Sequence, residues 1–387
     1  MNLPNNQQDT LYVDTDAACV QACAQLAEAE YLALDTEFIR EKTYFPELCL
    51  LQITGPRLTA LFDPQALSTL DPIIPLLLNA KITKVFHSGS QDLELLYQTL
   101  KVIPQPIYDT QVAASLLGYP LQVSYAALIE KELGIALDKN QTRTLWSRRP
   151  LTAAQCEYAA DDVRYLYAVY PLQLEALNAL GRLAWLTPEL EHLTLPEGFQ
   201  SKPQDLWKKV KGHQTLHGIE LALLQAYAQW RDALAQLHNR PRKFVVSDTA
   251  LLDLVRFRPA QLSDLNRALP PNLGKPEREE LIALTQKILQ QPASSWPRLA
   301  DFTRLNPDQE ALVSCLGAVL RHYASQANLC PELIAGRKDL EQLVLGATDL
   351  AVLSGWRHEQ VGQHLQRFLQ GGCSVRAHQG KLELSYK

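Results

Sequence analysis

The first half of the chain combines short apolar segments, which predict strands, with segments of helical periodicity. Residues 31–38, 49–54 and 58–62 are apolar and follow one another at hairpin spacing, so they predict three neighbouring strands. Residues 16–30 are rich in Ala and amphipathic, which indicates a helix before these strands. This order predicts an α/β or α+β domain with a mixed sheet. A helix interrupted by Pro72 and Pro75 is predicted over 66–79, and a strand over 82–87. A further helix is predicted to begin at an N-cap on Asp109 and to run to 117. The remaining predicted helices cover 91–100, 123–133 and 152–178.

The second half has helical periodicity until its tail. A domain boundary is predicted near 187–213, because that stretch combines prolines and glycines and ends in a basic run. Prolines at 292, 297 and 307 mark a second break between two helical blocks. Residues 230–241 can be aligned with 320–331, since both end a helix at a proline and lead through a short loop into an apolar helix. This indicates a diverged repeat, although any two helical hairpins share part of the pattern.

Composition narrows the class of protein. The chain has 387 residues, of which 47% are hydrophobic, and its net charge is −5, so two or three folded domains are expected and general disorder is excluded. The longest apolar runs are far shorter than the roughly 20 residues of a membrane span, and the first 30 residues show no secretory signal. Seven cysteines without a framework spacing are expected to be reduced thiols, which favours a cytoplasmic protein.

The charge is distributed unevenly along the chain. Residues 1–190 carry 22 Asp and Glu against 13 Lys and Arg, whereas the remainder carries 20 against 24. An acidic half followed by a basic half fits a metal-using site joined to a surface that binds a polyanion. Chance variation between two domains is the alternative.

Two carboxylates interrupt the first apolar strand. Asp35 and Glu37 are separated by one residue, so in a strand their side chains point to the same face. Carboxylates side by side in a largely buried strand are costly unless a cation or a proton offsets their charge. A divalent metal ion is the natural solution, because Mg²⁺ and Mn²⁺ prefer oxygen ligands. A solvated edge strand is the alternative.

Further acids follow at two later positions. Asp92 lies in the first turn of a predicted helix, where it could also act only as a partner of the helix dipole. Tyr158 shares a helix face with both Asp161 and Asp162, and helical geometry does not choose between them. Taken together, the four carboxylates could converge on two metal ions that stabilise the attacking and leaving oxygens of a phosphoryl displacement. An exposed acidic stripe is the alternative for the helical pair.

Three segments resemble the motifs of the tyrosine-containing branch of the DEDD exonuclease superfamily. They are LALDTEF, HSGSQDLELL and CEYAADDVRYL, and the segments around them are similar to the ribonuclease D family. Residues 216–290 resemble an HRDC domain, and a degenerate second copy would follow. The resemblance implies a ribonuclease H-like exonuclease domain with a mixed sheet over 1–190, a linker over 191–213, an all-α HRDC domain over 214–293, a second HRDC-like domain over 298–375 and a tail over 376–387.

The resemblance also implies the roles of the site residues. Asp35 and Glu37 match the acids of the first motif, Asp92 that of the second, and Asp162 with Tyr158 the Tyr-x-x-x-Asp pattern of the third. The four acids would bind two divalent ions, Mg²⁺ or Mn²⁺, and Tyr158 would orient the attacking water. The implied activity is 3′-to-5′ hydrolysis of RNA that releases 5′-mononucleotides, and the family's substrates are tRNA precursors with 3′ extensions.

Contacts with RNA are expected on a basic stretch near the site. No acid occurs from 139 to 150, and basic residues with an aromatic suit a single strand, although a solvated loop is the alternative. A DNA-directed exonuclease and a non-catalytic RNA-binding adaptor remain alternative functions. No membrane contact and no obligatory protein partner are expected. The candidate RNA-binding residues are Phe38, Lys139, Arg143, Trp146, Arg148 and Arg149.

Overall fold

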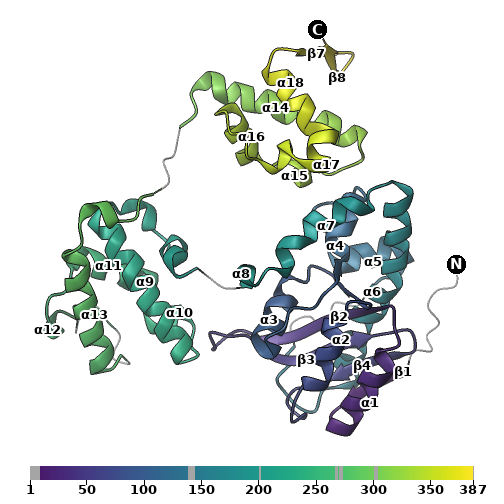
Figure 1. Cartoon of the computed structure of the whole chain (residues 1–387), viewed down its shortest axis with the longest axis horizontal. Coiled ribbons are helices and arrows are strands. Elements are labelled where there is room, and N and C mark those ends of the chain that lie inside the picture. The colour runs from purple at the N-terminus through teal and green to yellow at the C-terminus, as the bar shows by residue number, and fades with distance from the viewer. Residues whose placement is uncertain are drawn as a thin grey trace.

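The computed structural model describes residues 9–137, 144–199, 202–265, 269, 273–299 and 304–386. The first half of these residues contains a six-stranded sheet (Figure 1). Its strands are β1 (Asp9–Val13), β2 (Tyr31–Ile39), β3 (Glu47–Thr54), β4 (Leu58–Phe62), β5 (Thr83–Phe86) and β6 (Ile107–Asp109). Their spatial order is β1-β4-β3-β2-β5-β6, in which β2, β3 and β4 are antiparallel neighbours and β1, β5 and β6 join in parallel. The predicted mixed sheet and its three hairpin-spaced strands are therefore confirmed.

Helices cover both faces of this sheet. Asp109 caps α4 (Thr110–Leu116), because its carboxylate accepts hydrogen bonds from the amides of the first turn, as predicted. The helix expected over 66–79 was wrong in its first part, because only the 3₁₀ turn Asp71–Ile73 and α2 (Ile74–Leu78) are helical. Pro72 and Pro75 each lie at the start of one of these segments, where a missing N–H costs nothing. The helices are α1 (Asp16–Leu26), α2 (Ile74–Leu78), α3 (Ser90–Leu100), α4 (Thr110–Leu116), α5 (Tyr125–Leu133), α6 (Ala153–Ala179) and α7 (Leu183–Glu191).

The alternation of β2 assigns its side chains to two different layers. Leu32 and Leu34 pack in the same core as α1, whereas Ala33 packs with Val163 of α6. Strand alternation therefore directs the odd-numbered residues of β2, including its two acids, towards α6. Because β5 pairs with β2 only over residues 31–33, no described strand covers that edge farther along β2, and the start of α3 lies there instead.

Two helical units follow the sheet domain. The first contains the 3₁₀ segment η3 (Pro203–Lys209), which falls inside the predicted linker. Trp207 of this segment is nevertheless buried in the same core as α9 (Ile219–Leu237). The second ends in a hairpin of two strands. Their main elements are α9 (Ile219–Leu237), α10 (Arg242–Val245), α11 (Asp248–Phe257), α12 (Leu262–Leu265) and α13 (Lys275–Leu289), then α14 (Pro307–Gln326), α15 (Pro331–Ile334), α16 (Arg337–Val344), α17 (Gly355–Arg357), α18 (Gln363–Leu369), β7 (Cys373–His378) and β8 (Lys381–Tyr386).

The two units repeat one local structure. Each long helix ends before an asparagine with positive φ, Asn239 at 45° and Asn328 at 49°. The one-turn helices α10 and α15 then begin at 242 and 331, and α11 and α16 begin at 248 and 337, so every pair is 89 residues apart. The sequence alignment, which pairs the prolines at 241 and 331, is therefore shifted by one residue from the register of the structure. The element order of the predicted repeat is confirmed, and its register is set by the asparagine turn.

Both asparagine turns contact the sheet domain. The side-chain oxygen of Asn239 accepts hydrogen bonds from the amides of Tyr44 and Phe45, each at 3.1 Å, in the loop between β2 and β3. In Figure 1 this loop reaches towards α10. At the other turn, Asn328 packs closely on Gly118: a Cβ atom added to Gly118 would lie 2.8 Å from the side-chain amide nitrogen of Asn328. The two units therefore dock through equivalent turns.

Contacts beside the second turn fix that unit more firmly. Glu189 of α7 accepts hydrogen bonds from both terminal guanidinium nitrogens of Arg357, the Nη2 contact being 2.6 Å, and from the indole nitrogen of Trp356 at 3.0 Å. The rings of Trp185 and Trp356 stack with centroids 4.8 Å apart. Leu186 and Leu190 share one hydrophobic core with the second unit.

Two general expectations can be compared with the structure. All seven cysteines are free thiols. Within the described ranges, no helix has both the length and the apolar character needed to cross a bilayer.

Candidate active site

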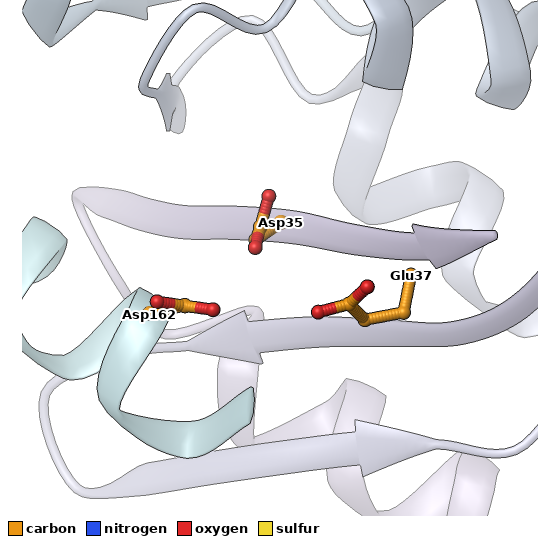
Figure 2. Close-up of side chains that lie close together, drawn as sticks. All are labelled: Asp35, Glu37 and Asp162. Atoms are coloured by element: carbon orange, nitrogen blue, oxygen red, sulfur yellow. The ribbon is translucent and has the colours of Figure 1, made fainter. Parts of the chain in front are cut away.

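Three carboxylates from two elements meet at one place. Asp35 and Glu37 come from β2 and Asp162 comes from α6, which crosses the sheet on that face. Each offers an oxygen within 4.8 Å of the others, and all three side chains are half-buried. Figure 2 shows the carboxylates of Asp162 and Glu37 pointing towards one another beside Asp35. The predicted pairing of strand acids with an acid of the later helix is thus present in the fold.

The rotation of α6 decides between its two adjacent acids. The helix begins with a capping box between Thr152 and Gln155, which sets its start. Asp161 points away from the cluster and forms an ion pair with Arg164 at 3.2 Å. Asp162 faces β2 and is hydrogen-bonded by the hydroxyl of Tyr158 one turn earlier. Tyr158 therefore stands beside the cluster, as the family motif implied.

Asp92 lies next to the cluster without joining it. Its side chain is only 8% exposed, in the first turn of α3, and the hydroxyl of Thr36 donates a hydrogen bond to it. The three-carboxylate group found among the described residues does not include Asp92. It is nevertheless close enough that its charge raises the pKa of both Asp35 and Glu37.

The electrostatics of the site favour a bound cation. Burial, followed by the charge of neighbouring carboxylates, raises the pKa of Asp35 well above its usual range and that of Glu37 to about 9. Burial likewise raises the pKa of Asp162 to about 7 and that of Asp92 to about 6, although hydrogen bonds from Tyr158 and Thr36 oppose these shifts. The main causes of these shifts include no cation among the described residues. Hard oxygen ligands that hold protons this strongly fit divalent ions, which would replace the protons.

The predicted RNA-binding residues have different surroundings. Phe38 packs against the core, and Trp146 is only 3% exposed, with its ring 6.1 Å from that of Tyr158. Arg148 is exposed. Arg149 serves the fold, because its guanidinium binds Asp63 at 2.6 and 2.7 Å and also donates to backbone carbonyls. Lys139 and Arg143 lie outside the described residues.

Sequence reasoning missed two polar residues beside the acids. Thr36 lies between the two strand acids and binds Asp92. Gln52 of β3 is opposite Asp35 in the strand register and is completely buried. The sequence signal for both is a polar residue inside an otherwise apolar strand, which becomes informative only when the strand pairing is known.

Comparisons with known proteins agree with this site. The 3′-5′ exonuclease family matches residues 11–175, and the HRDC domain family matches residues 220–284. Ribonuclease D from Bartonella henselae is 35% identical over 367 residues, which cover 93% of this chain and 90% of that protein. The chain belongs to the ribonuclease D family. Ribonuclease D from Sphingobium indicum is 34% identical and covers 94% of this chain and 96% of its own length.

A solved ribonuclease D structure supports the same assignment. The crystal structure of Escherichia coli RNase D, described as an exoribonuclease involved in structured RNA processing, is 30% identical to this chain. It superposes with a TM-score of 0.80 over 94% of this chain and 99% of its own. The ribonuclease H-like exonuclease fold with a following HRDC helical domain is thereby confirmed. As a member of the ribonuclease D family, the chain is a 3′-to-5′ exoribonuclease, a hydrolase, and its exonuclease domain implies the use of divalent metal.

Proposed function

We propose that this exoribonuclease shortens the 3′ extensions of tRNA precursors one nucleotide at a time, using two ions of Mg²⁺ or Mn²⁺. The observation that carries the proposal is the meeting of Asp35, Glu37 and Asp162, with the buried Asp92 close enough to raise the pKa of Asp35. When bound, such ions act as Lewis acids towards the attacking water and the departing 3′ oxygen.

The chain's own residues supply the order that this chemistry needs. Asp35 lies next to both other acids and is the candidate for contacting both ions. Glu37 and Asp162 face each other and would serve the side of the attacking water. Asp92 would serve the leaving-group side. The hydroxyl of Tyr158, which donates its proton to Asp162, can accept a hydrogen bond from the attacking water and so fix its approach. Each cycle would release a 5′-mononucleotide.

RNA contacts and domain limits belong to the same proposal. Phe38, Trp146, Arg148 and Arg149 remain candidates for contacting the terminal nucleotides, as do the undescribed Lys139 and Arg143. The exposed Arg148 is the most available of the described ones. The domain limits 1–190, 214–293 and 298–375, with a linker over 191–213 and a tail over 376–387, also remain our proposal.

A time course on a tRNA with a 3′ extension tests this function. Wild-type protein with Mg²⁺ or Mn²⁺ is expected to produce a ladder of single-nucleotide steps and free 5′-mononucleotides, whereas EDTA stops it. Asp35→Ala and Asp162→Asn are expected to abolish hydrolysis while RNA binding in calcium persists. The same assay on a matched DNA overhang addresses the rival substrate, and faster loss of DNA than of RNA contradicts the proposal. A wild-type protein that binds RNA but releases no nucleotide would instead be an adaptor.

A further inference from the structure

A cleft of about 910 Å³ lies between the exonuclease domain and the first helical unit. One wall comes from the loop after β2, with Arg40 and Tyr44, and from α3, with Tyr97 and Lys101. The other wall comes from the segment around α10, including Lys243. Tyr44 holds the two walls together, because its hydroxyl lies 3.0 Å from Asp232 and 2.9 Å from Arg242, and the Asn239 turn binds its amide.

The cleft is basic and partly aromatic. Its lining includes five cations and only two carboxylates, Glu41 and Glu94. Lys101 and Lys243 form no ion pair with a carboxylate among the described residues; Lys101 Nζ donates to a backbone carbonyl, and Lys243 Nζ lies 5.4 Å from the centre of the Phe244 ring. Both lysines are exposed. Positive charge next to aromatic rings suits a single-stranded polynucleotide, because the positive charge attracts its phosphates and its bases stack on the rings.

Two residues that line the cleft follow the acids of β2 and α3 closely in the sequence. Arg40 follows Glu37 by three residues and forms an ion pair at 3.3 Å with Glu94, which follows Asp92 by two residues on α3. This ion pair therefore joins the residue after β2, the strand of Asp35 and Glu37, to α3, the helix of Asp92, at the edge of the cleft.

We propose that this cleft binds the single-stranded segment of RNA that lies 5′ to the terminal nucleotides, with Lys101 and Lys243 contacting its phosphates from opposite walls. The inference rests on the exoribonuclease activity of the acidic site. It assigns to the docking of the first helical unit a direct part in substrate binding, because the contacts of Tyr44 with Asp232 and Arg242 hold the wall that carries Lys243 next to the exonuclease domain.

The test compares RNA lengths in the double variant Lys101→Ala, Lys243→Ala. The substrates are a dinucleotide, which cannot extend into the cleft, and a 5′-labelled dodecanucleotide of oligo(A). The ratio of kcat/KM for the dodecanucleotide to that for the dinucleotide is expected to fall roughly tenfold. Dodecanucleotide binding is measured by fluorescence anisotropy in EDTA at several salt concentrations. The slope of log K against log salt is expected to be about 1.4 smaller in magnitude for the double variant, since each phosphate contact on a single strand contributes about 0.7.

A matched control uses two exposed lysines of the second unit and its hairpin, Lys338→Ala with Lys381→Ala. This control is expected to leave both the length ratio and the salt slope as in the wild type. The cleft proposal is overturned if the Lys101–Lys243 variant keeps the wild-type ratio and slope, or if the control lowers them equally. A wild-type protein that hydrolyses neither substrate contradicts the proposed function instead, and the anisotropy slope still decides whether RNA occupies the cleft.

A second, independent observation concerns Gln52 of β3. Its side chain is completely buried, yet neither its amide nitrogen nor its oxygen has a hydrogen-bond partner among the described residues. Leaving such groups unpaired costs about 1–3 kcal/mol each, so a purely structural position would favour an apolar residue. The hydrogen bonds of the described residues therefore do not explain why a glutamine occupies this position.

The strand register places Gln52 beside the acids. It is directly opposite Asp35 in the antiparallel pair of β2 and β3, and directly opposite residues share a face with Cβ atoms about 5 Å apart. Its neighbours on that face, Leu50 and Leu61, pack in one core with Ala159 and Ala160 of α6. The amide is thus enclosed between β3 and the helix that carries Asp162.

We infer that Gln52 is a positioning residue for bound cations, whose amide pairs with the Asp35 carboxylate, or with a water between them, when cations occupy the site. Gln52→Leu is then expected to have two opposite effects. It should raise the thermal stability of the metal-free protein, because two unpaired polar atoms leave the core. It should also weaken Mn²⁺ binding by roughly 10–100-fold in calorimetry, the usual effect of losing a partner of a metal ligand.

Leu50→Met is the matched control, since it alters packing at the next position of the same face without touching an amide. It is expected to leave Mn²⁺ affinity close to that of the wild type. Gln52→Leu protein that binds Mn²⁺ as tightly as the wild type overturns the inference. A loss of stability in EDTA also overturns it, because the amide would then be satisfied in the metal-free fold.

Discussion

Replacing Asp162 with asparagine should inactivate the enzyme and, without metal, stabilise it. In the folded, metal-free protein, burial raises the pKa of this carboxyl group to about 7, from an ordinary value of 3.8. A carboxyl group with a raised folded-state pKa favours the folded state below its unfolded pKa, and this contribution is lost as the pH rises through the folded value. Asp162 therefore stabilises the metal-free fold least above pH 7.

The size of the effect follows from the two pKa values. Between pH 4 and pH 8 the ionisation of Asp162 removes at most about 4 kcal/mol, since one pKa unit corresponds to about 1.4 kcal/mol. Asparagine cannot ionise, so the variant keeps this stability at pH 8 except for the cost of burying its amide. For a domain of this size, we expect its unfolding temperature to exceed that of the wild type by about 5–10 °C at pH 8 and by little at pH 4.

The assay is differential scanning calorimetry of both proteins in EDTA at the two pH values. The relevant transition is the one that Mg²⁺ shifts upward in the wild type at pH 8. The same addition should not shift it in Asp162→Asn, because a ligand of the ion has been removed. A variant that is equally stabilised at both pH values, or destabilised at pH 8, would falsify the electrostatic account of the site.

Three further changes test other parts of the structure. Tyr158→Phe should lower kcat roughly 10–100-fold with little change in KM, and unchanged single-turnover rates would argue against water orientation. Lys84→Met should lower the free energy of unfolding by roughly 2–4 kcal/mol in urea titrations, because the buried ammonium donates to three backbone carbonyls; a neutral effect would mean that these carbonyls find other donors. Glu189→Gln should speed limited proteolysis between the domains, because it weakens the contact with Arg357 and Trp356; wild-type cleavage rates would show that the stacked rings suffice.

Predictions from sequence succeeded where local periodicity carries the information. Two acids separated by one residue on an apolar strand must share a face, which required only the geometry of a strand. The same geometry could not choose between Asp161 and Asp162, because both lie within one turn of Tyr158. The family motif chose Asp162, and in the structure Asp162 meets the two strand acids, whereas Asp161 pairs with Arg164 of the same helix.

Charge patterns were less informative than apolar ones. Arg149 has the same sequence signature as Arg148, yet one guanidinium is bound to Asp63, far away in the chain, and the other side chain is exposed. Similarly, the prolines that align the two helical blocks in sequence do not align in space, whereas Asn239 and Asn328 do, because a positive φ is required where each long helix turns. Sequence spacing does not report which partner lies opposite a charged side chain.

The sequence by itself determined the fold class, the ordered acids and the helical repeat, since these depend on which residues share a strand face or a helix turn. Only the tertiary structure decided which carboxylates share one site, that Gln52 is enclosed opposite Asp35 with no partner among the described residues, and that a basic cleft lies between the exonuclease domain and the first helical unit. These features depend on how strands pair and how domains dock. Both bring together residues far apart in the chain, whose proximity leaves no local pattern.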